Sequence, residues 1–197
     1  MYPWLRQIPN LISSLRILLV IPISLALMHR QFSTAIALFT LAAASDATDG
    51  FLAKRFGWQS TIGAMLDPAA DKLLLATLFV LLATLRLVPV WLTAVAVGRD
   101  IVIVLGAIAY RVCIGPVDWR PSGVSKLNTL CQVAFIMGVI AKEAVGLPPD
   151  WVVVMLGSLT FVTAVISGID YVLRYGSSAW QKAPSRRAAP AGGSRLP

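Results

Sequence analysis

Acidic residues, cysteine and histidine are scarce in this chain of 197 residues. It has nine aspartates and glutamates against 17 lysines and arginines, two cysteines and one histidine. Cys113 and Cys131 have neither a nearby histidine nor a Cys-x-x-Cys spacing, which favours structural thiols over a metal or redox role. The only histidine, His29, stands beside Arg30 and is interpreted as an interfacial side chain. The sequence therefore lacks the cysteine and histidine residues that a zinc site or Ser/His catalysis would need.

Charged residues of both signs make up only 13% of the chain, whereas hydrophobic residues make up 57%. This composition is too apolar for an ordinary soluble domain, and no alternation of apolar and polar residues indicates strands. A helix that spans a bilayer needs about 20 mainly apolar residues. We therefore expect an all-α polytopic membrane protein. Its six transmembrane helices are predicted near residues 11–29, 32–54, 66–86, 88–114, 125–145 and 150–174.

The two ends of the chain differ from this apolar middle. Aromatic and proline residues between Tyr2 and Pro9 predict a short interfacial segment, and the helix after it is interpreted as retained because no Ala-x-Ala cleavage site follows promptly. From Gly176 onward, Ser, Ala, Pro, Gly and Arg dominate, which predicts a disordered basic tail. The expected organisation is one membrane domain, residues 1–175, followed by a tail, residues 176–197.

Basic residues set the expected orientation, because loops retained in the cytoplasm are enriched in Lys and Arg. With the N-terminus inside, 13 basic residues lie near the cytoplasmic face and three, Arg30, Arg86 and Lys142, lie opposite. Both termini are therefore expected to face the cytoplasm. The net charge of +8 is explained by attraction to the anionic headgroups of the lipid bilayer. No basic stripe with interleaved aromatics indicates a nucleic-acid partner.

Four of the nine acidic residues fall within 26 positions, at Asp46, Asp49, Asp67 and Asp71. The first two are three apart and the last two four apart, so each pair shares one face of a helix. Two such helices side by side would bring four carboxylates together at the cytoplasmic face. Hard oxygen ligands of this kind suit Mg²⁺ or Mn²⁺.

Each of these residues also has a plain structural interpretation. Asp46 and Asp49 could lie near the membrane interface, where a charge costs less. Asp67 precedes a proline and could cap a helix, and Asp71 could form a solvated pair with Lys72. Two glycines among them, at positions 50 and 63, could serve tight helix packing or let a phosphate approach the backbone. Four acids at these spacings favour the functional interpretation.

The same run resembles the signature of the CDP-alcohol phosphatidyltransferase family, Asp-x2-Asp-Gly-x2-Ala-Arg-x8-Gly-x3-Asp-x3-Asp. The chain matches it, with the same intervals, at Asp46, Asp49, Gly50, Ala53, Gly63, Asp67 and Asp71. It departs at Lys54, which keeps the charge of the family's arginine but not the planar fork that binds phosphate with two bonds. Six helices, an N-terminal interfacial segment and cytoplasmic termini also fit the family's architecture.

The resemblance implies an enzyme that transfers the phosphatidyl group of CDP-diacylglycerol to the hydroxyl of an acceptor and releases CMP. It also implies a homodimer. The metal ligands that it implies are Asp46, Asp49 and Asp67, with Asp71 near the metal and acting as the general base. The substrate-binding residues that it implies are Gly50, Ala53, Lys54 and Gly63. Charge chemistry agrees, since the diphosphate must be neutralised before attack and the carboxylate least tied to metal is the natural proton acceptor.

Outside the signature, Arg99 with Asp100, and Lys126 with Asn128, are candidates for binding the acceptor. The alternatives are an intramembrane ion pair and a helix-packing amide. The two segments are more similar to the eukaryotic-type cardiolipin synthases of the family than to its phosphatidylglycerophosphate synthases, which more often carry a second lysine where Asn128 stands. Phosphatidylglycerol carries less negative charge than glycerol 3-phosphate. A site with Asn128 in place of the second lysine, and so with one cation fewer, therefore fits phosphatidylglycerol. We expect a cardiolipin synthase, with a phosphatidylglycerophosphate synthase as the alternative.

Two further classes of protein are less consistent with the sequence. An ion-coupled transporter could also hold acids within six helices, but it would need discontinuous helices or repeat symmetry, and the sequence indicates neither. A structural membrane scaffold would have little use for four clustered acids. Release of CMP from a CDP-lipid would distinguish the enzyme from both.

Overall fold

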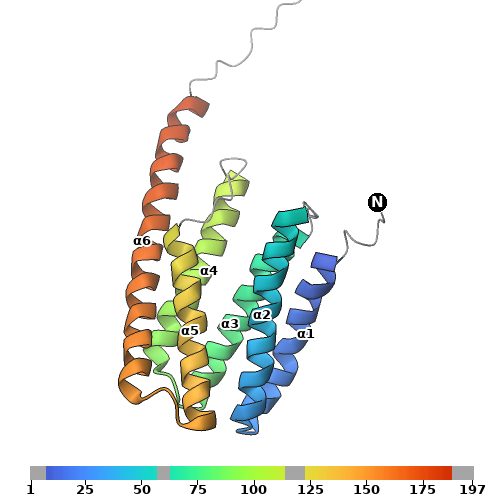
Figure 1. Ribbon diagram of the computed structural model, residues 1–197. Helices are drawn as coiled ribbons and strands as arrows, with labels where there is room; N and C mark the ends of the chain where they lie inside the picture. Colours follow the sequence, from blue (N-terminus) through green and yellow to red (C-terminus); the bar gives the residue numbers. More distant parts are fainter. Residues whose placement is uncertain (1–7, 57–62, 114–122, 188–197) are drawn as a thin grey trace, which may run out of the picture.

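The computed structural model describes residues 8–56, 63–113 and 123–187, whose regular structure is entirely helical. The helices lie side by side and run up and down (Figure 1). They are α1 (Ile8–Met28), α2 (Phe32–Phe56), α3 (Gly63–Thr84), α4 (Val90–Cys113), α5 (Gly123–Val145) and α6 (Asp150–Arg187). Side chains are described for residues 17–45, 71–106, 108 and 123–173. The expected number and order of helices are thus confirmed.

The end of α6 differs from the expectation. Composition predicts a disordered tail from Gly176, but the helix continues to Arg187. No proline interrupts the chain between Gly176 and Pro184, and a single glycine costs a helix only about 1 kcal/mol, so the backbone has no strong reason to stop there. The rest of the expected tail, residues 188–197, and most of the expected interfacial segment, residues 1–7, lie outside the described residues.

Three helices, α1, α3 and α5, end at the same end of the bundle (Figure 1). At the end of α1, the N–H of Arg30 donates to the carbonyl of Leu27 (2.9 Å) and the N–H of Gln31 to that of Ala26 (2.8 Å), and α3 ends in the same way around Arg86. These bonds satisfy carbonyls that the last helical turn leaves open. The residues in left-handed conformation at these ends are Arg30 (φ 56°), Arg86 (φ 61°) and Gly146 (φ 75°).

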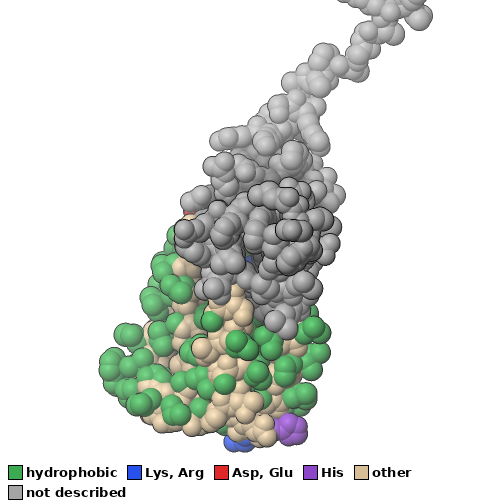
Figure 2. Space-filling model, turned by 45° about the vertical axis from the view of Figure 1, so that its right-hand side comes forward, with side chains coloured by type: hydrophobic (Ala, Val, Ile, Leu, Met, Phe, Trp, Pro, Cys, Tyr) green, Lys and Arg blue, Asp and Glu red, His purple; other side chains and the backbone are tan. Residues whose placement is uncertain are grey.

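An apolar core joins α1, α2 and α3 to α5. Its largest fully buried hydrophobic side chains are Ile23, Leu27, Phe39, Leu78, Phe79, Leu82, Ile136 and Ile140. The ring of Phe79 stacks on that of Phe135, with 6.0 Å between centroids, and so links α3 to α5. Many other large hydrophobic side chains are exposed, and Figure 2 shows them spread over the described part of one face. This arrangement is typical of a helical bundle surrounded by lipid.

Two helical segments of the described chain are long and apolar enough to cross a bilayer, Gly123–Val145 and Asp150–Leu173. The apolar segments Ile17–Met28 and Phe32–Ser45 are shorter. By length and composition, these two helices are candidate membrane spans. Six crossings stay a prediction.

Candidate active site

The four signature aspartates lie on the two helices that the spacing predicts. Asp46 and Asp49 are in the C-terminal part of α2, and Asp67 and Asp71 are in the N-terminal part of α3. Because α2 and α3 follow one another in opposite directions, these parts lie at the same end of the bundle, away from the turns at Arg30 and Arg86 (Figure 1).

Most signature side chains lie outside the part whose side chains are described, and their convergence stays a prediction. They are those of Asp46, Asp49, Ala53, Lys54 and Asp67, and the same holds for the surroundings of Gly50 and Gly63. Asp71 is described, and it is partly buried.

Asp71 lines a cavity of about 420 Å³ between α2, α3 and α5, and Lys126 lines the same cavity. The rest of the lining is nearly all apolar. It comprises Phe39, Ala42, Ala43, Leu74, Leu75, Thr129, Leu130 and Val133. The volume is within the range of small-molecule sites. One carboxylate and one ammonium on an apolar wall suit an amphipathic ligand with a polar group that meets the charges.

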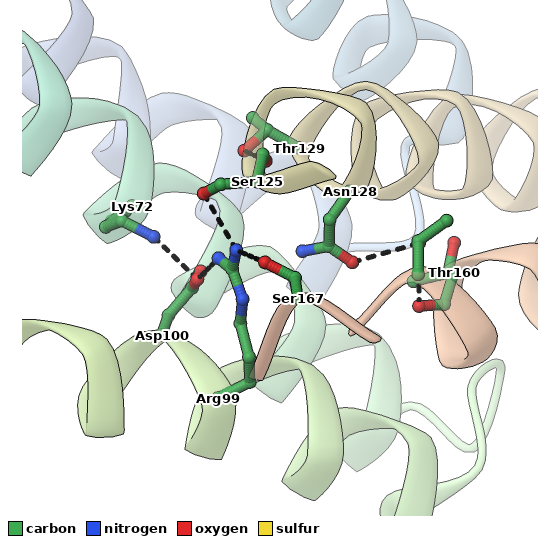
Figure 3. Close-up of polar contacts among 9 residues, drawn as sticks. Lys72, Arg99, Asp100, Ser125, Asn128, Thr129, Thr160 and Ser167 are labelled. Atoms are coloured by element: carbon green, nitrogen blue, oxygen red, sulfur yellow. Dashed lines mark hydrogen bonds and ion pairs between the residues drawn. The ribbon is translucent and has the colours of Figure 1, made fainter. Parts of the chain in front are cut away.

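Beside the cavity, α4 contributes a buried ion pair, Arg99 and Asp100, which we name the dyad. Only 7% of Arg99 and 8% of Asp100 is exposed. The Oδ1 atom of Asp100 accepts from the Arg99 guanidinium and also from Lys72 Nζ of α3 at 2.5 Å (Figure 3). Arg99 further donates to Ser125 Oγ of α5 at 2.8 Å and to Ser167 Oγ of α6. The dyad thus connects four helices.

A second polar group lies between α5 and α6. The hydroxyl of Thr163 donates to Oδ1 of Asn128 at 3.1 Å, and that of Thr160 donates to the carbonyl of Cys131 at 3.2 Å. Asn128 is fully buried and does not line the cavity. This geometry favours the helix-packing interpretation of Asn128. Its position does not support the predicted contact with a substrate.

Helical spacing explains the position of Asn128. It lies two positions after Lys126, which is a rotation of about 200° around the helix. The cavity side of α5 carries positions 126, 129, 130 and 133, whereas Asn128, Gln132 and Phe135 are buried on other sides. This spacing in the sequence already indicated that Lys126 and Asn128 lie on different sides of α5 and do not belong to one binding site.

Three polar partners of the dyad, Lys72, Ser125 and Ser167, were not identified from the sequence. The alternative interpretation of Asp71 and Lys72 as a solvated pair does not agree with the structure, in which the Lys72 ammonium binds Asp100. The signal that could have found these partners is the rule that charges buried among apolar helices pair with other polar groups. The rule names no partner, which depends on how the helices cross.

A model of the CDP-alcohol phosphatidyltransferase family matches residues 6–169 of this chain. The chain belongs to this family. Cardiolipin synthases (CMP-forming) from Rattus norvegicus and Homo sapiens are each 29% identical to it over 185 residues, which is 86% of this chain and 61% of theirs. The chain thus spans about three fifths of the length of these relatives.

Other relatives within the CDP-alcohol phosphatidyltransferase family carry a different name. A probable phosphatidylglycerophosphate synthase from Mycobacterium tuberculosis is 30% identical over 177 residues, which is 86% of this chain and 82% of its own. A CDP-diacylglycerol–glycerol-3-phosphate 3-phosphatidyltransferase from Pseudomonas fluorescens is 45% identical over 104 residues, 49% of this chain and 52% of its own. Both groups of synthases are therefore similar to this chain, and identity alone does not choose between them.

CDP-alcohol phosphatidyltransferases generally depend on a divalent metal ion. The donor set of this chain fits such an ion, because α2 and α3 carry four carboxylates at one end of the bundle and carboxylate oxygens are the ligands of Mg²⁺ and Mn²⁺. Among the side chains that the structure describes, no three His, Cys, Asp or Glu residues gather as a metal site. Three of the four aspartates fall outside that set.

Proposed function

We propose that this protein transfers the phosphatidyl group of CDP-diacylglycerol to a hydroxyl-bearing acceptor, with release of CMP and with the help of Mg²⁺ or Mn²⁺. The observation that carries the proposal is the position of Asp71. Asp71 is the last of the four signature aspartates, and it lines a cavity in which Lys126 is the other charged residue among those that the structure describes. A proton acceptor and a cation therefore face the space that an acceptor lipid would enter.

In the proposed reaction, Asp71 takes the proton of the acceptor hydroxyl. The hydroxyl oxygen then forms a bond to the phosphorus on the lipid side of the diphosphate, the bond from this phosphorus to the bridging oxygen breaks, and CMP leaves with the electron pair. A metal ion held by Asp46, Asp49 and Asp67 would neutralise charge on the diphosphate. Gly50, Ala53, Lys54 and Gly63 are proposed to contact the CDP-lipid, and Lys126 the phosphate of the acceptor.

The cavity favours phosphatidylglycerol as the acceptor, which would make the protein a cardiolipin synthase. Among the described residues that line the cavity, Lys126 is the only cation. The guanidinium of Arg99 is already bonded to Asp100 and two serines. One cation matches the single charge of a phosphodiester better than the greater charge of glycerol 3-phosphate, and apolar walls suit acyl chains.

A phosphatidylglycerophosphate synthase is the second candidate function. The relatives from Mycobacterium tuberculosis and Pseudomonas fluorescens favour it. An ion-coupled transporter is not favoured, because all six helices are continuous within their described bounds.

We further propose that the protein is a homodimer in the bilayer and crosses it six times, with both termini and the active site at the cytoplasmic face. The end of the bundle that carries Arg30, Arg86 and Lys142 would then face the other side. At this end Lys142 pairs with Asp150, at the turn between α5 and α6. The few basic residues here support the orientation.

The test uses purified protein with CDP-diacylglycerol, Mg²⁺ or Mn²⁺, and equal amounts of phosphatidylglycerol and glycerol 3-phosphate. Mass spectrometry of the lipids is expected to show cardiolipin as the main product, together with one CMP for each molecule formed. A pool dominated by phosphatidylglycerophosphate would select the second candidate. Absence of CMP release with either acceptor, and also with serine or inositol phosphate, would contradict phosphatidyl transfer itself.

A further inference from the structure

Two pairs of adjacent residues divide their side chains between the cavity and the dyad. On α3, Asp71 lines the cavity and Lys72 binds the dyad. On α5, Lys126 lines the cavity and Ser125 accepts a hydrogen bond from the dyad. The dyad is therefore attached to each helix one residue away from a charged group of the cavity.

The atoms of the dyad are arranged as a branched link rather than as an isolated ion pair. A single oxygen of Asp100 holds both cations, and the guanidinium of Arg99 reaches α5 and α6 through one terminal nitrogen (Figure 3). The guanidinium is planar and presents its donors in a fixed fork, so the helices that it binds are held at a defined spacing.

Buried charges of this kind are a costly way to hold helices together. Apolar residues of similar volume commonly stabilise a core as well or better. What an ion pair adds is a defined relative position of the groups that it joins, because its bonds are short and directional. The helices α3 and α5 touch each other only over a short stretch, whereas α4 packs on α3 and α6 packs on both α4 and α5.

We propose that Arg99 and Asp100 are positioning residues, which fix the turn of α3 that carries Asp71 against the turn of α5 that carries Lys126. The Lys72 branch sets the position of the base, and the Ser125 branch sets the position of the cation. The proposal rests on the proposed function for the chemistry that is positioned. It assigns no substrate contact to the dyad, in contrast to the acceptor contact that the sequence suggests for Arg99.

Lys72→Met tests the first branch without leaving an unpaired buried charge, because Arg99 and Asp100 still neutralise each other. We expect kcat for CMP release to fall about tenfold or more, since misplacement of a catalytic group by about 1 Å can cost 10²-fold. The KM for CDP-diacylglycerol is expected to change less than about threefold, because uniform binding is untouched. Lys72→Arg, which can again bind Asp100, is expected to restore most of kcat.

Ser125→Ala tests the second branch. It should raise the KM for the acceptor more than it lowers kcat, because it loosens the turn that carries Lys126. Thr163→Val is the matched control, since it removes a buried hydrogen bond to Asn128 between α5 and α6 that does not involve the dyad. The control should leave both kinetic constants near those of the unaltered protein.

A second experiment measures the spacing of α3 and α5 directly and does not depend on enzyme activity. Spin labels at Leu73→Cys on α3 and Leu127→Cys on α5, both half-exposed positions, report the spacing of the two helices in a chain with Cys113 and Cys131 replaced by alanine. Lys72→Met and Asp100→Asn should broaden the distance distribution, and Thr163→Val should not. An unchanged distribution, or a Lys72→Met variant with normal kcat, overturns the positioning role. Lack of CMP release by the unaltered chain overturns the proposed function alone, because the distances still test the dyad.

Discussion

The first three helices and the last three are held together by different chemistry. Where side chains are described, α1, α2 and α3 bury only hydrophobic residues, most of them Leu, Ala and Phe. Among the described side chains, every buried polar residue lies on the other three helices. They are Thr93, Arg99 and Asp100 on α4, Asn128 and Gln132 on α5, and Thr160, Thr163 and Ser167 on α6.

This difference in packing suggests different roles for the two halves of the bundle. The first half carries the four signature aspartates, and the residues that it buries in its described part are apolar. The second half carries directional bonds, which fix spacing and register better than apolar contacts do. We infer that the first half supplies the reacting groups and that the second half sets where they meet the acceptor.

The largest effect is expected in the first half, from Asp46→Ala, Asp49→Ala or Asp67→Ala. Each should lower CMP release at least about 10²-fold, as loss of one group that stabilises charge in a transition state does. Removal of divalent metal with EDTA should have the same result. Asp150→Ala is the control, because this exposed acid lies at the other end of the bundle and pairs with Lys142. Turnover in EDTA would refute the metal site.

Asp71→Asn separates catalysis from binding within the same cluster. The amide keeps the shape of the side chain but accepts no proton, so turnover should fall about 10²- to 10⁴-fold, the usual contribution of a general base. Binding of CDP-diacylglycerol, measured by titration in the presence of metal, should stay within about threefold. Equal loss of binding and turnover would make Asp71 a ligand-binding residue and would place the base elsewhere.

Glycines in the second half provide a test of close packing. At Gly106 of α4, a Cβ atom would lie 2.9 Å from Cε1 of Tyr171 on α6. Gly106→Ala should therefore lower the free energy of unfolding by about 1–3 kcal/mol, the usual cost of overpacking. Gly98→Ala on the same helix meets nothing within 4 Å and should be neutral or slightly stabilising. Equal thermal stability of the two variants in detergent would show that α4 and α6 do not depend on this contact.

How much of the molecule could be predicted differs between the halves as well. Long apolar runs between charges predict all six helices, and the spacing of the aspartates predicts the helix faces that carry them. The partners of Arg99 could not be predicted, because Ser125 and Ser167 meet it only through the crossing of α4 with α5 and α6. No local pattern encodes such a crossing. The continuation of α6 beyond Gly176 was not predicted, because composition describes the average behaviour of a segment and does not say at which residue a helix ends.

The smallest expected effect concerns the turns, where the halves differ again. The first half ends α1 and α3 with Arg30 and Arg86 in left-handed conformation, whereas the second half ends α5 with Gly146. A side chain in this conformation costs about 1–2 kcal/mol, and glycine avoids that cost but loses about 0.5–1 kcal/mol through the entropy of the unfolded chain. Arg86→Gly should thus raise the free energy of unfolding by about 0.5 kcal/mol or slightly more.

Gly146→Ala should have the opposite sign, with a loss of about 1 kcal/mol, because nothing lies within 4 Å of the added methyl group and the backbone conformation alone opposes it. Arg86→Gln controls for the loss of charge, since it removes the guanidinium and keeps a side chain in the left-handed conformation. Thermal unfolding in one detergent should rank Arg86→Gly above the unaltered protein, Arg86→Gln level with it and Gly146→Ala below. If Arg86→Gln is instead as stable as Arg86→Gly, the gain in stability comes from removal of the charge. The left-handed conformation would then cost the turns of the two halves the same free energy.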